Sequence, residues 1–149
     1  MLVNSKILLK KAQEGHYAIP SANVIDMESI KNQIQLAEKL GAFLAQVAGG
    51  ISRLRVTYSG ALVDWKTGPI TTSILKGMLE RIVDDHVNLV NADYLTRRRG
   101  IKVEIVHRGN GDDYHNRIAV EAETAEGSVT IAGSVFQPDS PRIVEINGY

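Results

Sequence analysis

The chain has 149 residues, no cysteine, equal numbers of basic and acidic side chains and a hydrophobic content of 44%, which is the composition of one ordinary folded domain with a core of its own. The missing cysteines exclude disulfides, thiolate metal sites and cysteine nucleophiles, and they agree with a cytoplasmic location. The zero formal charge argues against nucleic-acid binding, and no apolar run approaches the roughly 20 residues that span a bilayer.

The first third of the chain is predicted as a helix, an extended segment and a second helix. Residues 4–14 carry apolar side chains at helical spacing. Pro20 would remove a ladder donor from residues 17–25, which are predicted as an edge strand or an extended connector. Asp26 is a candidate N-cap for a long helix that ends at two glycines. The apolar stripe of this helix is formed by Ile30, Ile34, Ala37, Leu40, Leu44 and Val47.

Beyond residue 50 the apolar residues mostly alternate, which is typical of half-buried strands. Strands are predicted over 53–58, 102–107, 117–123, 128–136 and 142–146. Two helices, over 70–83 and 88–99, are predicted between the first two strands, and residues 124–127 are typical of a hairpin turn. This order favours an α+β fold, with an antiparallel or mixed sheet packed with helices on one side and a helical N-terminal extension.

Candidate catalytic groups have little support in their spacing. The four histidines, His16, His86, His107 and His115, match no metal-binding pattern, and structural or surface roles are favoured for them. Residues 84–86 and 112–115 place carboxylates beside an imidazole, but sequence neighbours point in different directions and are better interpreted as solvated loop ends. Ser59 and Ser134 lie in no nucleophile elbow. We predict no catalytic residue, no metal site and no cofactor.

Basic side chains are better candidates for a functional site than these groups, because the planar guanidinium group binds carboxylate and phosphate well. If some of them converge they would form an anion site, and otherwise they are ordinary solvated faces. The candidates are Arg53, Arg55, Lys66, Lys76, Arg81, Arg97, Arg98, Arg99, Arg117 and Arg142.

Several short segments, in order, resemble the intervening domain of long-form D-3-phosphoglycerate dehydrogenases. They are LAEKLG at 36–41, QVAGG at 46–50, VTYSG at 56–60, ILKGML at 74–79, VNLVNA at 87–92, RGI at 99–101, IAG at 131–133 and PRIVEINGY at 141–149. The resemblance assigns residues 34–149 to that domain. It implies a non-catalytic, regulatory α+β domain of a serine-biosynthesis enzyme, with oligomer contacts and a site for an anionic substrate or effector.

The same resemblance places Arg142 where some relatives carry a lysine ligand, so Arg142 is the predicted anion-binding residue. The nicotinamide-binding glycine motif and the catalytic residues of the dehydrogenase have no counterpart in this chain, and we expect no hydride transfer by it.

A second resemblance covers residues 1–31. The sequence LLKKAQEGHYAIPSANV at 8–24 looks like the opening helix and strand of a class II fructose- or tagatose-bisphosphate aldolase, except that Ala22 stands where that family usually has phenylalanine. Thirty residues cannot form its barrel of roughly 250. Residues 1–33 are therefore interpreted as a fused segment, either engineered or naturally recombined.

Three functions remain open from the sequence. The chain is a regulatory module that binds a small anion, or a self-associating module without a ligand site, or a metal-dependent aldolase-like enzyme. We prefer the first two together and expect a homo-oligomer, with no nucleic-acid and no membrane partner. Light scattering would test the self-association, and zinc content would test the aldolase hypothesis.

Overall fold

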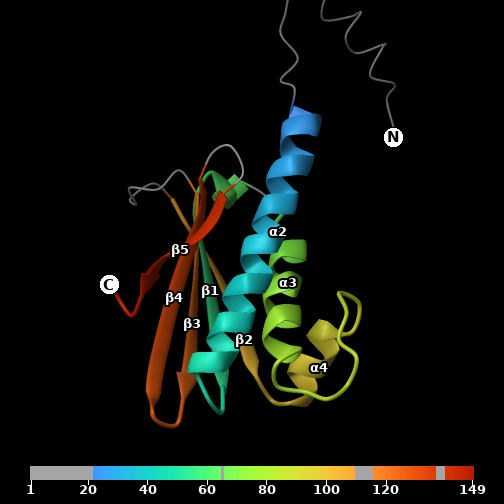
Figure 1. The fold of residues 1–149 in the computed structure, drawn as a ribbon, viewed down its shortest axis with the longest axis vertical. Coiled ribbons are helices and arrows are strands. Elements are labelled where there is room, and N and C mark those ends of the chain that lie inside the picture. Colours follow the sequence, from blue (N-terminus) through green and yellow to red (C-terminus); the bar gives the residue numbers. More distant parts are fainter. Residues whose placement is uncertain (1–21, 65, 110–115, 137–139) are drawn as a thin grey trace, which may run out of the picture.

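A five-stranded sheet forms one layer of the part of the chain that the computed structural model describes, namely residues 22–64, 66–109, 116–136 and 140–149 (Figure 1). The strand order is β2-β1-β3-β4-β5; β1 and β2 are parallel and the other pairs are antiparallel. A parallel pair needs a long crossover, and here helices supply it. The strands are β1 (Arg53–Gly60), β2 (Lys102–Arg108), β3 (Asn116–Thr124), β4 (Gly127–Phe136) and β5 (Ser140–Ile146).

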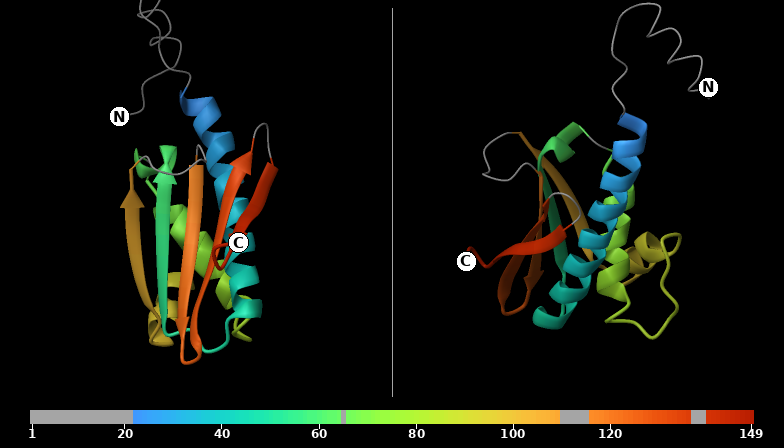
Figure 2. Two further views of the ribbon diagram at one scale, coloured as in Figure 1. Left: turned by 90° about the vertical axis from the view of Figure 1, so that its left-hand side faces the viewer. Right: turned by 45° about the horizontal axis from the view of Figure 1, so that its top comes forward.

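The helices gather on one face of this sheet and leave its other face open (Figure 2). They are α2 (Ala22–Val47), the short 3-10 helix η1 (Ala61–Asp64), α3 (Gly68–Leu79) and α4 (Ala92–Arg98). The predicted α+β fold with a mixed sheet and helices on one side is confirmed. In the described residues no helix is long and apolar enough to cross a bilayer.

The core lies between the sheet and the helices, as the alternating pattern predicts. On β1, Leu54, Val56 and Tyr58 are buried, while Arg53 and Arg55 point to the open face and are half-buried. From the other side α2 contributes buried leucines at helical spacing, Leu36, Leu40 and Leu44. Each buried side chain of this size contributes about 1.5–3 kcal/mol to folding.

Two glycines allow α2 and α3 to pack with their backbones in contact. A Cβ added to Gly41 would lie 2.1 Å from the carbonyl oxygen of Ile74, and one added to Gly77 would lie 2.2 Å from that of Glu38. Real Cβ atoms essentially never come closer than 3.0 Å. Both positions therefore require glycine for the observed separation of the helices.

The beginning of α2 differs from the sequence prediction. Residues 22–25 are helical, so the predicted extended segment is wrong at that end, and Asp26 lies inside the helix instead of capping it. At the ends of the predicted apolar stripe, Ile30 and Val47 are 38% and 47% exposed. The predicted helix over 4–14 lies outside the described residues.

The two later helices are shorter than predicted. Helix α3 ends at Leu79, after which Ile82 and Val83 both donate backbone hydrogen bonds to the Leu79 carbonyl. Helix α4 begins at Ala92 because the Asn88 side chain accepts hydrogen bonds from the amides of Val90 and Asn91 at 2.8 and 2.9 Å. Side chains that bond nearby amides in this way compete with the helix.

Candidate functional site

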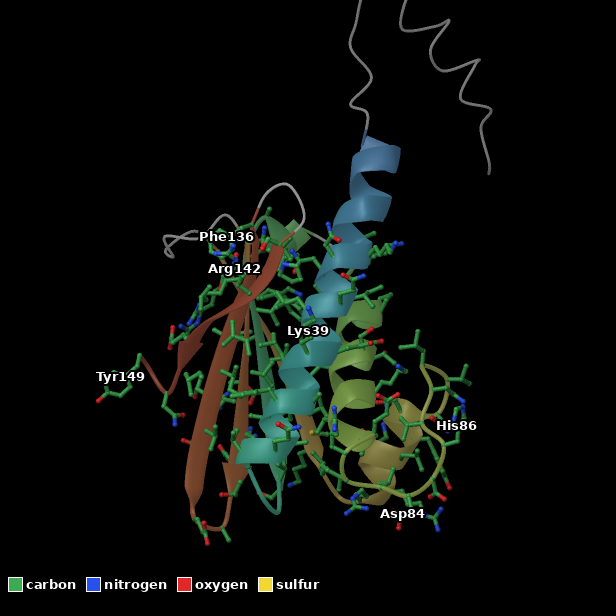
Figure 3. All side chains as sticks on the ribbon, viewed as in Figure 1. Lys39, Asp84, His86, Phe136, Arg142 and Tyr149 are labelled. Atoms are coloured by element: carbon green, nitrogen blue, oxygen red, sulfur yellow. The ribbon has the colours of Figure 1, made fainter. Side chains whose placement is uncertain are left out.

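Arg142, the predicted anion ligand, lies on the edge strand β5 opposite Ser134 of β4. Its Nε donates a hydrogen bond to Ser140 Oγ at 3.1 Å, and its guanidinium carbon lies 5.8 Å from the centre of the Phe136 ring (Figure 3). An aromatic ring attracts a guanidinium placed over its face. The Arg142 side chain is exposed and pairs with no carboxylate of the described residues. The described residues therefore leave its positive charge without an ion pair.

The neighbouring cation on this part of the sheet has a carboxylate partner. Arg117 of β3 pairs with Glu145 of β5, with 2.5 Å between Nη2 and Oε2, so the pair reaches across the intervening strand β4. Because Glu145 neutralises Arg117, the two arginines do not form a doubly charged pocket. The geometry leaves Arg142 as the cation of β5 that can meet an added anion.

Arg53 and Arg55 lie on the open face of the sheet in a chain of ion pairs. Glu104 of β2 accepts hydrogen bonds from Arg53 Nη2 at 2.9 Å and Arg55 Nε at 3.1 Å, and Arg55 also lies 3.5 Å from Glu121. The hydrogen bond from Arg55 is the main cause that lowers the pKa of Glu104, and the same bond raises the pKa of Arg55. These arginines are already neutralised and offer no anion site.

Two more of the candidate cations have carboxylate partners on the helices. Lys76 of α3 lies 3.3 Å from Glu38 and 3.1 Å from Glu80, and its hydrogen bond to Glu80 is the main cause that raises its pKa. Arg97 pairs with Asp93 one turn earlier on α4 at 2.9 Å. Arg81 and Arg99, in contrast, line one cavity together.

A polar cluster joins the start of α3 to β1 and β2. The buried hydroxyl of Tyr58 lies 2.6 Å from Thr71 Oγ1, and its ring stacks on His107 with centroids 5.6 Å apart. His107 Nε2 lies 3.2 Å from Thr67 Oγ1, so this histidine takes a structural role. Burial raises the pKa of Tyr58 to about 12, which keeps the phenol neutral at any physiological pH.

The other groups considered for catalysis are not brought together among the described residues. Ser134 Oγ donates to the Asn116 carbonyl oxygen at 2.5 Å, whereas the buried Ser59 Oγ has no hydrogen-bond partner among the described residues. His86 lies on the exposed segment before α4 (Figure 3). No group of three or more histidine or acidic side chains of the described residues could hold a metal. His16, His115, Trp65 and residues 112–114 lie outside these residues.

A wider groove runs beside the edge strand β2. It has a volume of about 680 Å³, and its lining includes Thr71 of α3, Arg97 of α4, and Lys102 and Ile105 of β2. Ile105 is 45% exposed there. Since Arg97 is paired with Asp93, Lys102 is the one cation of this groove without an ion pair among the described residues.

Asn116 is a structural residue that the sequence did not indicate. Its side-chain oxygen accepts hydrogen bonds from Gln33 of α2 at 3.1 Å and from the Val135 amide at 3.0 Å, and Ser134 bonds its backbone carbonyl. Asn116 therefore links α2, β3 and β4 at one end of the sheet. The sequence predicts only a loop up to this residue, because the partners are between 18 and 83 positions away.

Comparison with known proteins identifies a similar family. The family model for the D-3-phosphoglycerate dehydrogenase intervening domain matches residues 29–147. Among curated proteins, D-3-phosphoglycerate dehydrogenase of Methanocaldococcus jannaschii is 33% identical over 150 aligned positions, which cover 95% of this chain and 28% of that protein. The enzymes of Synechocystis and Bacillus subtilis are each 29% identical, over 96% and 88% of the chain and 26% and 25% of their own length.

The chain spans about a quarter of the length of these relatives. The alignments with the Methanocaldococcus jannaschii and Synechocystis enzymes cover 95% and 96% of this chain. The residues that they leave out are too few to account for the whole segment before the family match at residue 29, so these alignments also include most of residues 1–28. The predicted likeness of residues 1–31 to class II aldolases has no counterpart in these findings and stays a prediction.

Proposed function

This chain belongs to the D-3-phosphoglycerate dehydrogenase intervening-domain family, and from that membership we propose that it binds a small anionic acid as a non-catalytic regulatory module. Its relatives carry the name of an enzyme that acts on D-3-phosphoglycerate, so phosphorylated and carboxylic acids of serine biosynthesis are the first ligands to consider. The match over residues 29–147 supports a regulatory type of domain, distinct from the catalytic part of the enzyme.

The observation that carries this proposal is the environment of Arg142. Its guanidinium is exposed, is oriented by Ser140 and Phe136, and is not neutralised by a carboxylate of the described residues. Holding the side chain in one orientation lowers the entropy lost when an anion binds. A carboxylate or phosphate could accept two parallel hydrogen bonds from it.

Calorimetric titration of the whole chain with D-3-phosphoglycerate and with serine tests the proposal. We expect saturable binding that Arg142→Ala abolishes and that Arg98→Ala leaves intact, since Arg98 is an exposed cation on α4. Arg142→Lys keeps the charge but loses the planar fork, and it should bind more weakly than the wild type. The proposal is refuted if neither acid gives heat on titration, or if the Arg142→Ala variant binds as tightly as the wild type.

Self-association is a second candidate function, and the β2 edge of the sheet favours it. Strand β2 has an edge without a partner among the described residues, contains no proline or bulge, and presents Ile105 at 45% exposure. Edges of this kind pair readily with another chain. Light scattering should then give a mass above that of one chain, and Ile105→Glu should lower it. Val90→Glu is the matched control, because Val90 is 91% exposed but lies away from the sheet.

The origin of residues 1–33 is a separate proposal. The aldolase likeness supports a fused segment, whereas alignments that reach most of residues 1–28 support a segment shared with the dehydrogenase relatives. We favour the shared segment, because those alignments continue directly from the intervening domain.

A further inference from the structure

A second group of arginines meets at the end of the molecule where α2 connects to β1. A cavity of about 360 Å³ lies there, and Arg81 and Arg99 form part of its lining together with the backbone of Gly49 and Gly50. Arg81 comes just after the C-cap of α3, and Arg99 is the C-cap residue of α4. None of the described residues that line this cavity is acidic. Two cations from different elements thus share one space.

Neither arginine is neutralised within the described part of the chain. Arg53, Arg55 and Arg97 each pair with a carboxylate, whereas Arg81 and Arg99 have no ion pair or side-chain hydrogen bond there. The C-terminal ends of α2, α3 and α4 all lie at or next to these residues, and each carries a negative dipole equivalent to about half an elementary charge. The two full positive charges exceed the sum of these dipoles, about one and a half charges, so the cavity keeps a net positive charge.

The rest of the cavity lining combines the backbone of Gly49 and Gly50 with apolar residues such as Ile82. A Cβ at Gly49 or Gly50 would meet no atom within 4 Å, so nothing fills the space in front of these residues. Their amides donate no hydrogen bond to an acceptor of the described chain. Gly50 also has a φ of +66°, which other residues rarely adopt. Exposed backbone amides next to cations are typical partners of phosphate and carboxylate oxygens.

We propose that Arg81 and Arg99 form a binding site for a small dianion, either a phosphate monoester or a dicarboxylate. Each guanidinium presents a planar fork of donors that fits two oxygens, so two forks suit a ligand with several charged oxygens. The site is separate from Arg142. Ser128, at the cavity end of the sheet, and Ser134, beside Arg142, are six positions apart on β4, a span of about 20 Å. It does not depend on the ligand proposed for Arg142.

The test is a titration of the whole chain followed by the backbone amide resonances of Gly49, Gly50 and Ile51. Inorganic phosphate is the probe in one arm and malonate in the other, both at constant ionic strength. We expect saturable shifts at these amides, with apparent affinity weakened about tenfold or more by Arg81→Ala and by Arg99→Ala. Raising the salt concentration should weaken the binding further, because the arginines are exposed.

Arg98→Ala and Arg142→Ala are the controls. Arg98→Ala removes one positive charge from the same end of α4, but Arg98 does not line this cavity. This substitution should therefore change the affinity less than threefold. Arg142→Ala should leave these shifts unchanged even if it abolishes binding at β5. Phosphate binding without malonate binding would identify a phosphate monoester site, and the reverse a dicarboxylate site. The proposal is overturned if neither probe gives saturable shifts, or if Arg98→Ala weakens binding as much as Arg81→Ala.

Discussion

Replacing Gly77 by alanine tests the backbone contact between α2 and α3. The added Cβ would lie 2.2 Å from the Glu38 carbonyl oxygen, and ordinary contact begins near 3.4 Å, so the helices would have to separate by about an ångström. Overpacking of this kind costs about 1–3 kcal/mol or more. Alanine returns up to about 1 kcal/mol of helix propensity. We expect a net loss of about 2 kcal/mol in the free energy of unfolding.

Urea denaturation followed by circular dichroism measures this loss, and Gly68→Ala is its matched control. Gly68 is the first residue of the same helix, and a Cβ there would meet no atom within 4 Å. The control should therefore leave stability unchanged or raise it by a few tenths of a kcal/mol. If Gly77→Ala proved as stable as Gly68→Ala, the close approach of α2 to α3 would be wrong.

Three further predictions concern pH and polar contacts. The pKa of Tyr58 is raised from 10.0 to about 12 in the folded protein, so the unfolded chain loses the phenol proton at a lower pH than the folded one. The free energy of unfolding should therefore be unaffected by this group below pH 10 and should fall as the pH rises towards 12, and Tyr58→Phe should lessen that fall in urea titrations. The pKa of Glu104 is lowered, so its contribution is present above its ordinary value of 4.5 and is lost as the pH falls through the lowered value; Glu104→Gln should make urea midpoints less sensitive to pH in this range. Asn116→Ala should cost about 1–3 kcal/mol, measured by thermal unfolding, because it leaves Gln33 and the Val135 amide without their acceptor.

Local patterns in the sequence were sufficient to predict most strands of the sheet. Alternation predicts β1, β3 and β4, and the hairpin turn at residues 124–127 is confirmed by the pairing of Thr124 with Gly127. Helix ends were predicted less well, since they depend on side-chain contacts that spacing does not reveal. Asn88, for example, bonds the amides that would otherwise begin α4, although the apolar pattern continues through them.

The candidate sites depend on contacts between distant residues, so the sequence gives their members without their grouping. Arg142 follows from family resemblance, but its orientation by Phe136 depends on the pairing of β4 with β5. Arg81 and Arg99 are 18 positions apart, and only the packing of α4 beside α3 places them on one cavity. A list of basic residues could name both without predicting that they meet.

The positions of the ion pairs determine which arginines of the described residues keep an unneutralised charge. On the open face of the sheet, Glu104 and Glu121 neutralise the arginines of β1, and Glu145 neutralises Arg117. A surface that is neutral over its middle has little attraction for anions, and exposed ion pairs of this kind add little to stability. Among the described residues, Arg142 and the cavity pair Arg81 and Arg99 are guanidinium groups without an ion pair, and they lie toward opposite ends of the sheet. A small anion near this domain would be drawn to those ends, because charge there is not cancelled by a neighbour.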